Sequence, residues 1–286
     1  MFRVSANSEE ELLRLIEQRA DGIILAVAPF SVRQNCFLGS EDLRRTAGAI
    51  HESGLKICIN AMKMLEEQEI EKASAFLDLC QAAEVDEIYV ADEGWMQLAR
   101  EKDMIDRLIY QPETLIVNGF DAQFYIDQGL KAVSLAHELT LEEIVESAAV
   151  CSGLEVLIQG RYSWMNSRRK LLTNYFAETG LQQPTDEVYL LKEQKREAYL
   201  PVMENEAGTV VFSAEPVCSY DEIRTLADAG IRRFRIDTLF EDKDYGCQQL
   251  RIYRNLLEGR NVPDEQKKGS DHLYSMKTLT RKDEKA

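Results

Sequence analysis

Seven polar residues stand at the ends of short apolar runs, where side chains that bind or transform a small ligand are often placed in α/β proteins. Carboxylates can transfer protons, whereas amide and guanidinium groups can hold an oxygen-rich ligand. The carboxylates, which we expect to be catalytic, are Asp92, Glu138 and Asp237; the expected substrate-binding residues are Asn60, Asn118, Gln159 and Arg161. Taken singly, each is better explained as a helix cap or a solvated loop side chain, so the set is more informative than any member.

A basic stretch follows the last of these runs in an otherwise acidic chain. It contains Arg161, Arg168, Arg169 and Lys170. A guanidinium grips a planar oxyanion at two points, so the stretch predicts a bound phosphate or dicarboxylate, with Arg161, Arg168 and Arg169 as ligands. Salt bridges to the abundant carboxylates are an equally good explanation. The nearby aromatic rings can stack on a base, although packing is the more common role.

The cysteines and histidines give little support to metal or nucleophilic chemistry. The six cysteines are widely separated, with no C-x-x-C pair and no histidine at ligand spacing, so we expect them to be core residues. Neither H-E-x-x-H nor G-x-S-x-G occurs. Cys58 with His137 is the one conceivable thiol pair. His137 and Glu138 are neighbours that should face opposite sides of a strand, and we expect Glu138 to face the interior.

Eight β-rich runs alternate with segments of helical periodicity, which is the pattern of βα units. Parallel strands that are buried on both faces lack strict alternation, as these runs do. The runs cover residues 2–6, 22–27, 56–61, 87–92, 108–119, 131–136, 155–160 and 233–238. We therefore predict a closed (β/α)8 barrel of the TIM type. An open doubly wound sheet is the runner-up, but no G-x-G-x-x-G follows the first run.

Two segments interrupt this pattern. Residues 161–218 form a long insertion between the seventh and eighth strands, and insertions of this kind usually shape the mouth of a barrel. Residues 263–286 are polar and rich in lysine, which predicts a tail outside the barrel at residues 1–262.

Composition limits the function classes. The chain has 286 residues with 45% hydrophobic content, enough for one barrel, and its net charge of -16 argues against general nucleic-acid binding. Neither a signal peptide nor a membrane-spanning run is visible, so we expect a cytoplasmic protein.

Several segments resemble the collagenase-like peptidase family in the family's own order. Residues 36–61 are similar to its second helix and third strand, and residues 86–99 to its fourth strand and following turn. Residues 112–144 resemble its fifth and sixth strands and close in HELTLEEI, and residues 155–176 match its Gly-Arg and Arg-Cys segments. Residues 204–237 resemble its hallmark, an acidic residue, Gly-Thr, a strand and a last helix. The resemblance covers about 250 residues and implies the barrel fold.

The departures from the family pattern concern the cysteines. Longer relatives begin a set of four cluster cysteines after the arginine, but here Lys170 follows Arg169 and Cys218 is alone in the later region. The resemblance therefore implies no cofactor in this chain, with an iron–sulfur cluster in a partner subunit, because a cluster needs four thiolates.

The resemblance also implies a function and partners. Similar proteins hydroxylate the wobble uridine of tRNA at carbon five, using prephenate or a product of it, and others act on ribosomal RNA or ubiquinone. We expect a non-cluster subunit of a tRNA hydroxylation complex, with a longer homologous family member as partner and tRNA bound through the complex. The alternatives are a collagenase-like peptidase acting alone and a non-catalytic scaffold protein.

Overall fold

The computed structural model describes residues 1–6, 8–33, 37–183, 188–192 and 198–263. Cys36 lies outside the described residues, and so does the expected tail from residue 264 onward. The strands are β1 (Phe2–Ser5), β2 (Gly22–Val27), β3 (Phe37–Leu38), β4 (Lys56–Ala61), β5 (Glu87–Val90), β6 (Leu108–Tyr110), β7 (Ala132–Ser134), β8 (Leu154–Gly160), β9 (Ser163–Ser167), β10 (Val188–Lys192), β11 (Tyr199–Asn205), β12 (Gly208–Phe212), β13 (Val217–Cys218) and β14 (Arg233–Ile236). The helices are α1 (Glu9–Glu17), α2 (Leu43–Glu52), α3 (Ile70–Ala82), α4 (Gly94–Glu101), α5 (Gly119–Asp127), α6 (Leu141–Val150), α7 (Leu171–Thr179), α8 (Ile223–Asp228) and α9 (Tyr245–Leu257).

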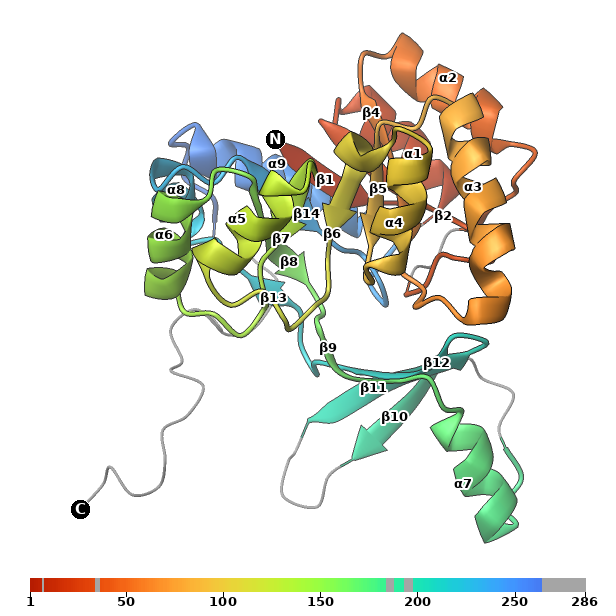
Figure 1. Ribbon diagram of the computed structural model, residues 1–286. Coiled ribbons are helices and arrows are strands. Elements are labelled where there is room, and N and C mark those ends of the chain that lie inside the picture. The colour runs from red at the N-terminus through yellow and green to blue at the C-terminus, as the bar shows by residue number, and fades with distance from the viewer. Residues whose placement is uncertain (7, 34–36, 184–187, 193–197, 264–286) are drawn as a thin grey trace. The chain divides into compact units, whose positions relative to one another are not determined.

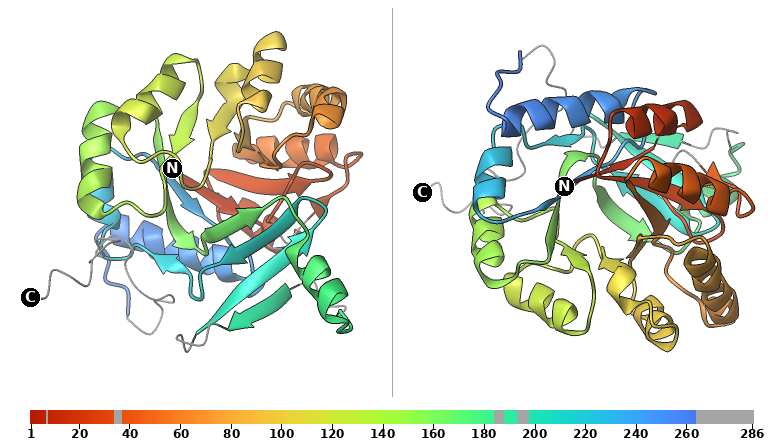
Figure 2. Two further views of the ribbon diagram at one scale, coloured as in Figure 1. Left: turned by 60° about the horizontal axis from the view of Figure 1, so that its bottom comes forward. Right: turned by 90° about the horizontal axis from the view of Figure 1, so that it is seen from above.

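Parallel strands close into a ring. Going round it, β1, β2, β4, β5, β6, β7, β8 and β14 pair in turn, and β14 returns to β1 with Phe2 opposite Phe234. Figure 2 shows this ring of strands at the centre and the helices around it. All residues of these strands except Lys56 are buried, as expected for parallel strands covered on both faces. The predicted (β/α)8 barrel is confirmed, and the open sheet is wrong.

The fifth barrel strand is shorter than its sequence predicts. We expected residues 108–119, but β6 ends at Tyr110. Pro112 has no backbone N–H to donate to a neighbouring strand, and Glu113 takes a left-handed backbone conformation with φ 67°. The apolar residues beyond them therefore belong to a loop that leads from the carboxyl end of β6 to α5.

The helices cover the outer faces of the strands (Figure 1). Outward-facing Phe2 and Phe234 have ring centroids 5.6 Å apart, and Phe2 also packs against Tyr253 of α9. At the start of α6, Thr140 accepts the Glu143 N–H while the Glu143 carboxylate accepts the Thr140 N–H. This reciprocal capping box fixes where the helix begins, which in turn fixes the loop that follows β7.

Residues 161–216 form a second compact unit, and the first comprises Met1–Gly160 with the described residues from Val217 onward. Within the second unit, antiparallel strands run in the order β10, β11, β12, β9. Leu200, Val202 and Val211 form its core, against which Leu172 of α7 packs. This small sheet has its own hydrophobic core and is described separately from the barrel.

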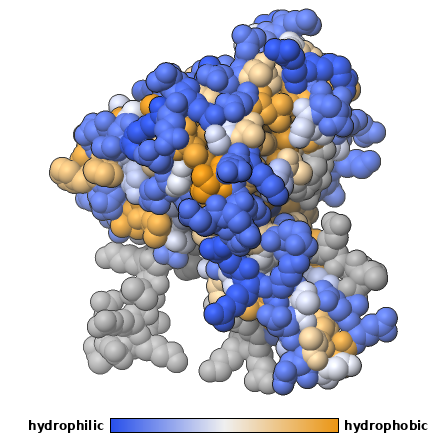
Figure 3. Space-filling view, turned by 45° about the vertical axis from the view of Figure 1, so that its right-hand side comes forward, coloured by the Kyte–Doolittle hydropathy of each residue, from blue (hydrophilic) through white to orange (hydrophobic). Residues whose placement is uncertain are grey.

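The net charge of -16 predicts a largely hydrophilic surface. The face drawn in Figure 3 is mostly hydrophilic, with hydrophobic side chains gathered in separate spots. Across the part of the chain that the structure describes, no helix combines the length and apolar character needed to cross a membrane.

Candidate functional site in the barrel interior and at its mouth

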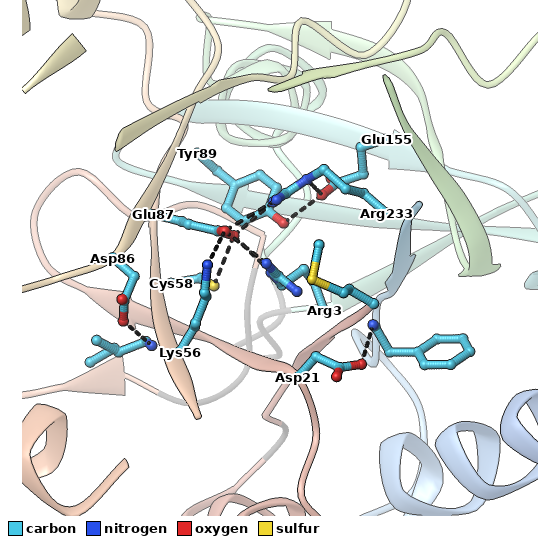
Figure 4. A network of polar contacts seen from close by, with 12 residues as sticks. Arg3, Asp21, Lys56, Cys58, Asp86, Glu87, Tyr89, Glu155 and Arg233 are labelled. Carbon is cyan, nitrogen blue, oxygen red and sulfur yellow. Dashed lines mark hydrogen bonds and ion pairs between the residues drawn. The ribbon is translucent and has the colours of Figure 1, made fainter. Parts of the chain in front are cut away.

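The amino-terminal half of the barrel interior is filled by a charged network (Figure 4). Glu87 of β5 binds Arg3 of β1 through two hydrogen bonds of 2.7 Å, and Arg233 of β14 through bonds of 3.1 and 2.7 Å. Glu155 of β8 accepts the Tyr89 hydroxyl at 2.9 Å and lies 3.4 Å from Arg233 Nε. Because Glu87, Arg3, Arg233 and Glu155 lie in the first two residues of their strands, the network lies away from the face where barrel enzymes bind ligands.

Cys58 belongs to this network. Its thiol donates to Glu87 Oε2 at 3.5 Å, and both side chains are fully buried. Burial, and then the Glu87 carboxylate, raise the pKa of the Cys58 thiol well above its usual value. His137, by contrast, contacts residues at the other end of the barrel. The conceivable Cys58 and His137 pair is therefore not formed, since the two side chains belong to different polar clusters.

A second charged cluster, which we call the mouth cluster, lies at the carboxyl ends of the strands. It consists of Arg33 after β2, Glu113 after β6, His137 after β7, and Arg235 and Asp237 in and after β14. Arg33 Nη2 lies 3.1 Å from Glu113 Oε1, and His137 Nδ1 lies 3.5 Å from Glu113 Oε2. Arg235 donates from Nη2 to His137 Nε2 at 3.2 Å, and its Nε lies 3.4 Å from Asp237 Oδ2.

Burial and charge set the protonation states in this cluster. Burial would raise the pKa of Glu113, but Arg33, His137 and Arg235 outweigh it and lower the value to about 2. Burial lowers the pKa of His137 to about 4, with Arg235 and Arg33 opposing the attraction of Glu113. His137 is therefore neutral at pH 7. Because an arginine only donates, the His137 Nε2 is the acceptor and its proton is assigned to Nδ1.

This arrangement corrects the expected direction of two neighbouring side chains. We expected Glu138 rather than His137 to face the interior. His137 is the buried member of the pair, with 8% of its surface exposed, whereas Glu138 is exposed. The strand β7 ends at Ser134, so the alternation of side chains between the two faces of a strand does not extend to residues 137 and 138.

Arg235 and Asp237 are the members of the mouth cluster best suited to meet a ligand. Arg235 is 1% exposed, and within the described residues its Nε and Nη1 make no hydrogen bond. A buried donor without an acceptor is costly, so an oxygen of a ligand would stabilise this guanidinium. The Asp237 side chain is 26% exposed, and burial raises its pKa against the opposing effect of Arg235. A partly accessible carboxyl with a raised pKa can exchange a proton with a bound molecule.

The backbone around the mouth cluster is held in uncommon conformations. Arg33 and Glu113, which pair with each other, both have positive φ, 58° and 67°. Such conformations in non-glycine residues are found mostly where the surrounding structure fixes them, often at functional sites. Gly160, at the end of β8, has φ 131°, and a Cβ there would lie 2.7 Å from the Asp237 carbonyl oxygen. Only glycine allows β8 to approach Asp237 this closely.

Three of the predicted residues secure loops around the barrel mouth. The Asn60 side chain accepts the N–H groups of Val32 and Met62 and donates to the Val32 carbonyl. The Asp92 carboxylate accepts the N–H groups of Leu65 at 2.7 Å and of Gly94 at 2.9 Å. Their polar atoms are therefore already engaged by the backbone of the loops.

The third loop residue, Asn118, caps α5 by accepting the Asp121 N–H at 2.9 Å. Gln159 lies outside the ring of strands, where its amide donates to the Tyr245 hydroxyl and accepts the Tyr253 hydroxyl, both from α9. Of the seven residues predicted at strand ends, Asp237 is the one found in the mouth cluster.

The predicted anion-binding arginines belong to the second unit. Arg161 donates to the carbonyls of Ser213 and Ala214, and Arg168 and Arg169 are exposed. Lys170, which follows them, pairs with Glu206 at 2.7 Å. Their roles as substrate ligands stay predictions.

The described cysteines do not fit an iron–sulfur cluster. Cys58, Cys80, Cys151, Cys218 and Cys247 are all buried, as predicted; four of them lie on β4, α3, β13 and α9, and Cys151 follows the end of α6. Among the described residues, no three His, Cys, Asp or Glu side chains come together in a way that could hold a metal ion. A cluster with four thiolate ligands therefore has no place in the described part of this chain.

Sequence reasoning missed Arg33, Glu113 and Arg235. A signal for Arg235 was available, because Arg233 and Arg235 alternate in a strand that is otherwise apolar. Charged residues at a period of two in a buried strand indicate a polar barrel interior. No comparable signal marks Arg33 or Glu113, since both lie in loops and meet only in the folded chain.

The closed (β/α)8 barrel defines this chain as a TIM-type barrel protein, and the mouth cluster lies at the carboxyl ends of its strands, the face where barrel enzymes bind their ligands. Residues 7–282 match the model of Peptidase family U32, and the chain belongs to this family.

Named relatives divide between RNA hydroxylation and proteolysis. The chain is 25% identical to tRNA hydroxylation protein P2 of Bacillus subtilis over 263 residues, which are 89% of this chain and 84% of that protein. It is 27% identical to an uncharacterized protease of Methanocaldococcus jannaschii, covering 88% of this chain and 64% of that protein. It is 24% identical to the 23S rRNA 5-hydroxycytidine synthase of Escherichia coli, covering 84% of this chain but 36% of that protein.

A solved structure of a U32 peptidase superposes with a TM-score of 0.51 at 14% identity, covering 82% of this chain and 91% of that chain. At this identity the likeness supports the fold alone.

Proposed function

We propose that this chain is a subunit of a cytoplasmic tRNA hydroxylation complex that acts on the wobble uridine, with a longer homologue supplying the iron–sulfur cluster. The observation that carries the proposal is the similarity to tRNA hydroxylation protein P2, which extends over 84% of that protein. The scattered, buried cysteines support it, because the redox chemistry must then come from another chain.

In this proposal the mouth cluster holds a small, oxygen-rich ligand. Arg235 offers guanidinium donors that make no hydrogen bond to the described residues, Asp237 offers the proton-exchanging carboxyl, and Arg33 with Glu113 holds the surrounding loops. The tRNA is bound through the complex, since a net charge of -16 repels a phosphate backbone.

Proteolysis by this chain alone has less support from the geometry. The Cys58 thiol is buried with a raised pKa, and the His137 Nε2 already accepts a hydrogen bond from Arg235. A thiol nucleophile needs a thiolate and a free base, and neither side chain offers one.

Mass spectrometry of tRNA from a strain that lacks the gene tests the proposal. We expect 5-hydroxylated wobble uridine to disappear and to return when the wild-type gene is restored. Complementation with Asp237→Asn, which keeps the side-chain shape, should restore it poorly, whereas Asp228→Asn on the exposed end of α8 should restore it fully. Unchanged hydroxylation in the deletion strain would refute the proposed function, and full activity of Asp237→Asn would favour a scaffold role.

A further inference from the structure

A cluster of large apolar side chains lies exposed on the outer surface of the barrel at α5. Phe120 is 76% exposed and Phe124, one turn later, is 58% exposed. Leu115 and Val117, in the loop that leads into α5, are 63% and 47% exposed. We call these four residues and Val150 the α5 patch.

Val150 joins this patch from the neighbouring helix. It is 41% exposed at the end of α6, and its Cβ would lie 2.7 Å from a Cβ built on Gly119, the first residue of α5. Val150 therefore lies beside the start of the helix that carries Phe120 and Phe124. Single exposed apolar residues are ordinary on a protein surface, but a group with two exposed phenylalanines is typical of a protein–protein contact.

The helix that carries the α5 patch is held in place from behind. Asn118 caps its start, and Tyr125 donates its hydroxyl to Glu93 at 3.0 Å and packs 4.4 Å from the ring of Tyr110. A partner that binds here meets a preorganised surface, which reduces the entropy lost on association.

Exposed acidic side chains lie on the same two helices as the α5 patch. Asp121 and Asp127 of α5 and Glu142 and Glu146 of α6 are all exposed. Two copies of a chain with net charge -16 would bring these carboxylates together and repel each other. The surface instead fits a partner with an apolar centre and a rim of lysine and arginine.

We propose that the α5 patch is the docking surface for a basic partner protein, and, resting on the proposed function, that this partner is the longer subunit of the hydroxylation complex. A complex that binds tRNA needs positive charge, which this chain does not supply. Contact with a basic partner through the acidic residues of α5 and α6 would partly neutralise the negative charge of this chain.

Co-purification of the tagged chain with the co-expressed longer homologue tests the inference. Phe120→Asn with Phe124→Asn should weaken the complex by at least about tenfold in Kd, as expected for aromatic residues at the centre of an interface. Both side chains are exposed, so folding should be unchanged by circular dichroism. The matched control is Leu13→Asn, which removes an apolar side chain that is 62% exposed on α1. It should leave the complex intact.

Charge reversal supplies a second, independent measurement. Asp127→Lys with Glu146→Lys should weaken the complex, and the wild-type complex should weaken as salt increases. Equal co-purification of wild type and the phenylalanine variant would overturn the inference while leaving the proposed function in place. Failure of the wild-type chain to bind the homologue, together with normal tRNA hydroxylation in the deletion strain, would instead remove the proposed function.

Other occupants of the α5 patch give different results. If the wild-type chain alone sediments as a dimer and the phenylalanine variant as a monomer, the occupant is a second copy. If removing residues 264–286 increases binding of an apolar dye and the phenylalanine variant cancels the increase, the occupant is this chain's own terminal segment. Either result would contradict the inference.

Discussion

Replacing Glu87 by glutamine should strongly destabilise the barrel. The Glu87 carboxylate makes four hydrogen bonds of 2.7 to 3.1 Å to Arg3 and Arg233, and its side chain is fully buried. A glutamine has one acceptor oxygen, and its NH₂ group would face guanidinium donors. Breaking a buried ion pair by removing one partner typically costs about 3–5 kcal/mol, because the remaining charge stays buried and uncompensated.

Urea denaturation at pH 7 measures this loss in the free energy of unfolding. Glu10→Gln is the matched control, because Glu10 pairs with Lys243 at 3.9 Å and both side chains are more than two-thirds exposed. The control should lose less than about 1 kcal/mol. A loss of that size for Glu87→Gln as well would refute the structural role that we assign to the network.

The pH dependence provides a further check on the same variant. Burial would raise the pKa of Glu87, but its hydrogen bonds with Arg3 and Arg233 outweigh this effect and hold the pKa far below its usual value. The stabilisation from Glu87 is therefore complete above a pH of about 4.3, the unfolded value, and is lost as pH falls below it. The difference between wild type and Glu87→Gln should shrink in the same acidic range.

Three further predictions concern single residues. The pKa of His137 is about 4 in the folded protein, below its unfolded value of about 6.5. The free energy of unfolding of the wild type should therefore fall by on the order of 3 kcal/mol between pH 6.5 and pH 4, because the unfolded chain binds the proton first. Urea titrations of His137→Gln should lack this decrease. Cys58 should resist a thiol reagent at pH 8 until the protein unfolds, because its thiol is buried and its pKa is raised; rapid labelling of the native protein would contradict this. Gly160→Ala should destabilise the protein by at least about 1–3 kcal/mol, because φ 131° is strained for alanine and the new Cβ would collide with the backbone of Asp237. Thermal unfolding measures this loss. Gly48→Ala is the control, because the new Cβ there would have no neighbouring atom within 4 Å.

The sequence predicted the barrel because its signal is local and repeated. Each run of buried β-rich residues is followed by a helix, and eight such units in one chain favour a closed parallel sheet, in which each strand has two neighbours. The same local rules misplaced the end of the fifth strand, because apolar residues after Pro112 continue the pattern while the backbone at Glu113 has already turned.

The site was harder to predict than the fold. Asn60 lies near the end of β4, and Asp92 and Asn118 follow β5 and β6, but a side chain at such a position can bind either a ligand or the nearest backbone N–H. The structure shows that all three bind backbone groups. The pairing of Arg33 with Glu113 joins loops separated by 80 residues, and a single sequence carries no information on such a contact.

The two charged layers of the barrel interior should respond differently to the loss of an arginine. Arg233, in the amino-terminal layer, makes two hydrogen bonds with Glu87 and an ion pair with Glu155. Arg235, one inward-facing position further along β14, makes one hydrogen bond with His137 and one ion pair with Asp237, and its Nη1 makes no hydrogen bond to the described residues.

Arg233→Met should therefore cost more unfolding free energy than Arg235→Met, since removing it breaks more contacts and leaves Glu87 and Glu155 undercompensated. If Nη1 of Arg235 binds a ligand, Arg235→Met should abolish tRNA hydroxylation in the complementation assay. Arg233→Met should retain it when the hydroxylation is normalised to the amount of folded protein. The opposite order in both measurements would mean that the amino-terminal layer binds the ligand and that the mouth cluster only supports the fold.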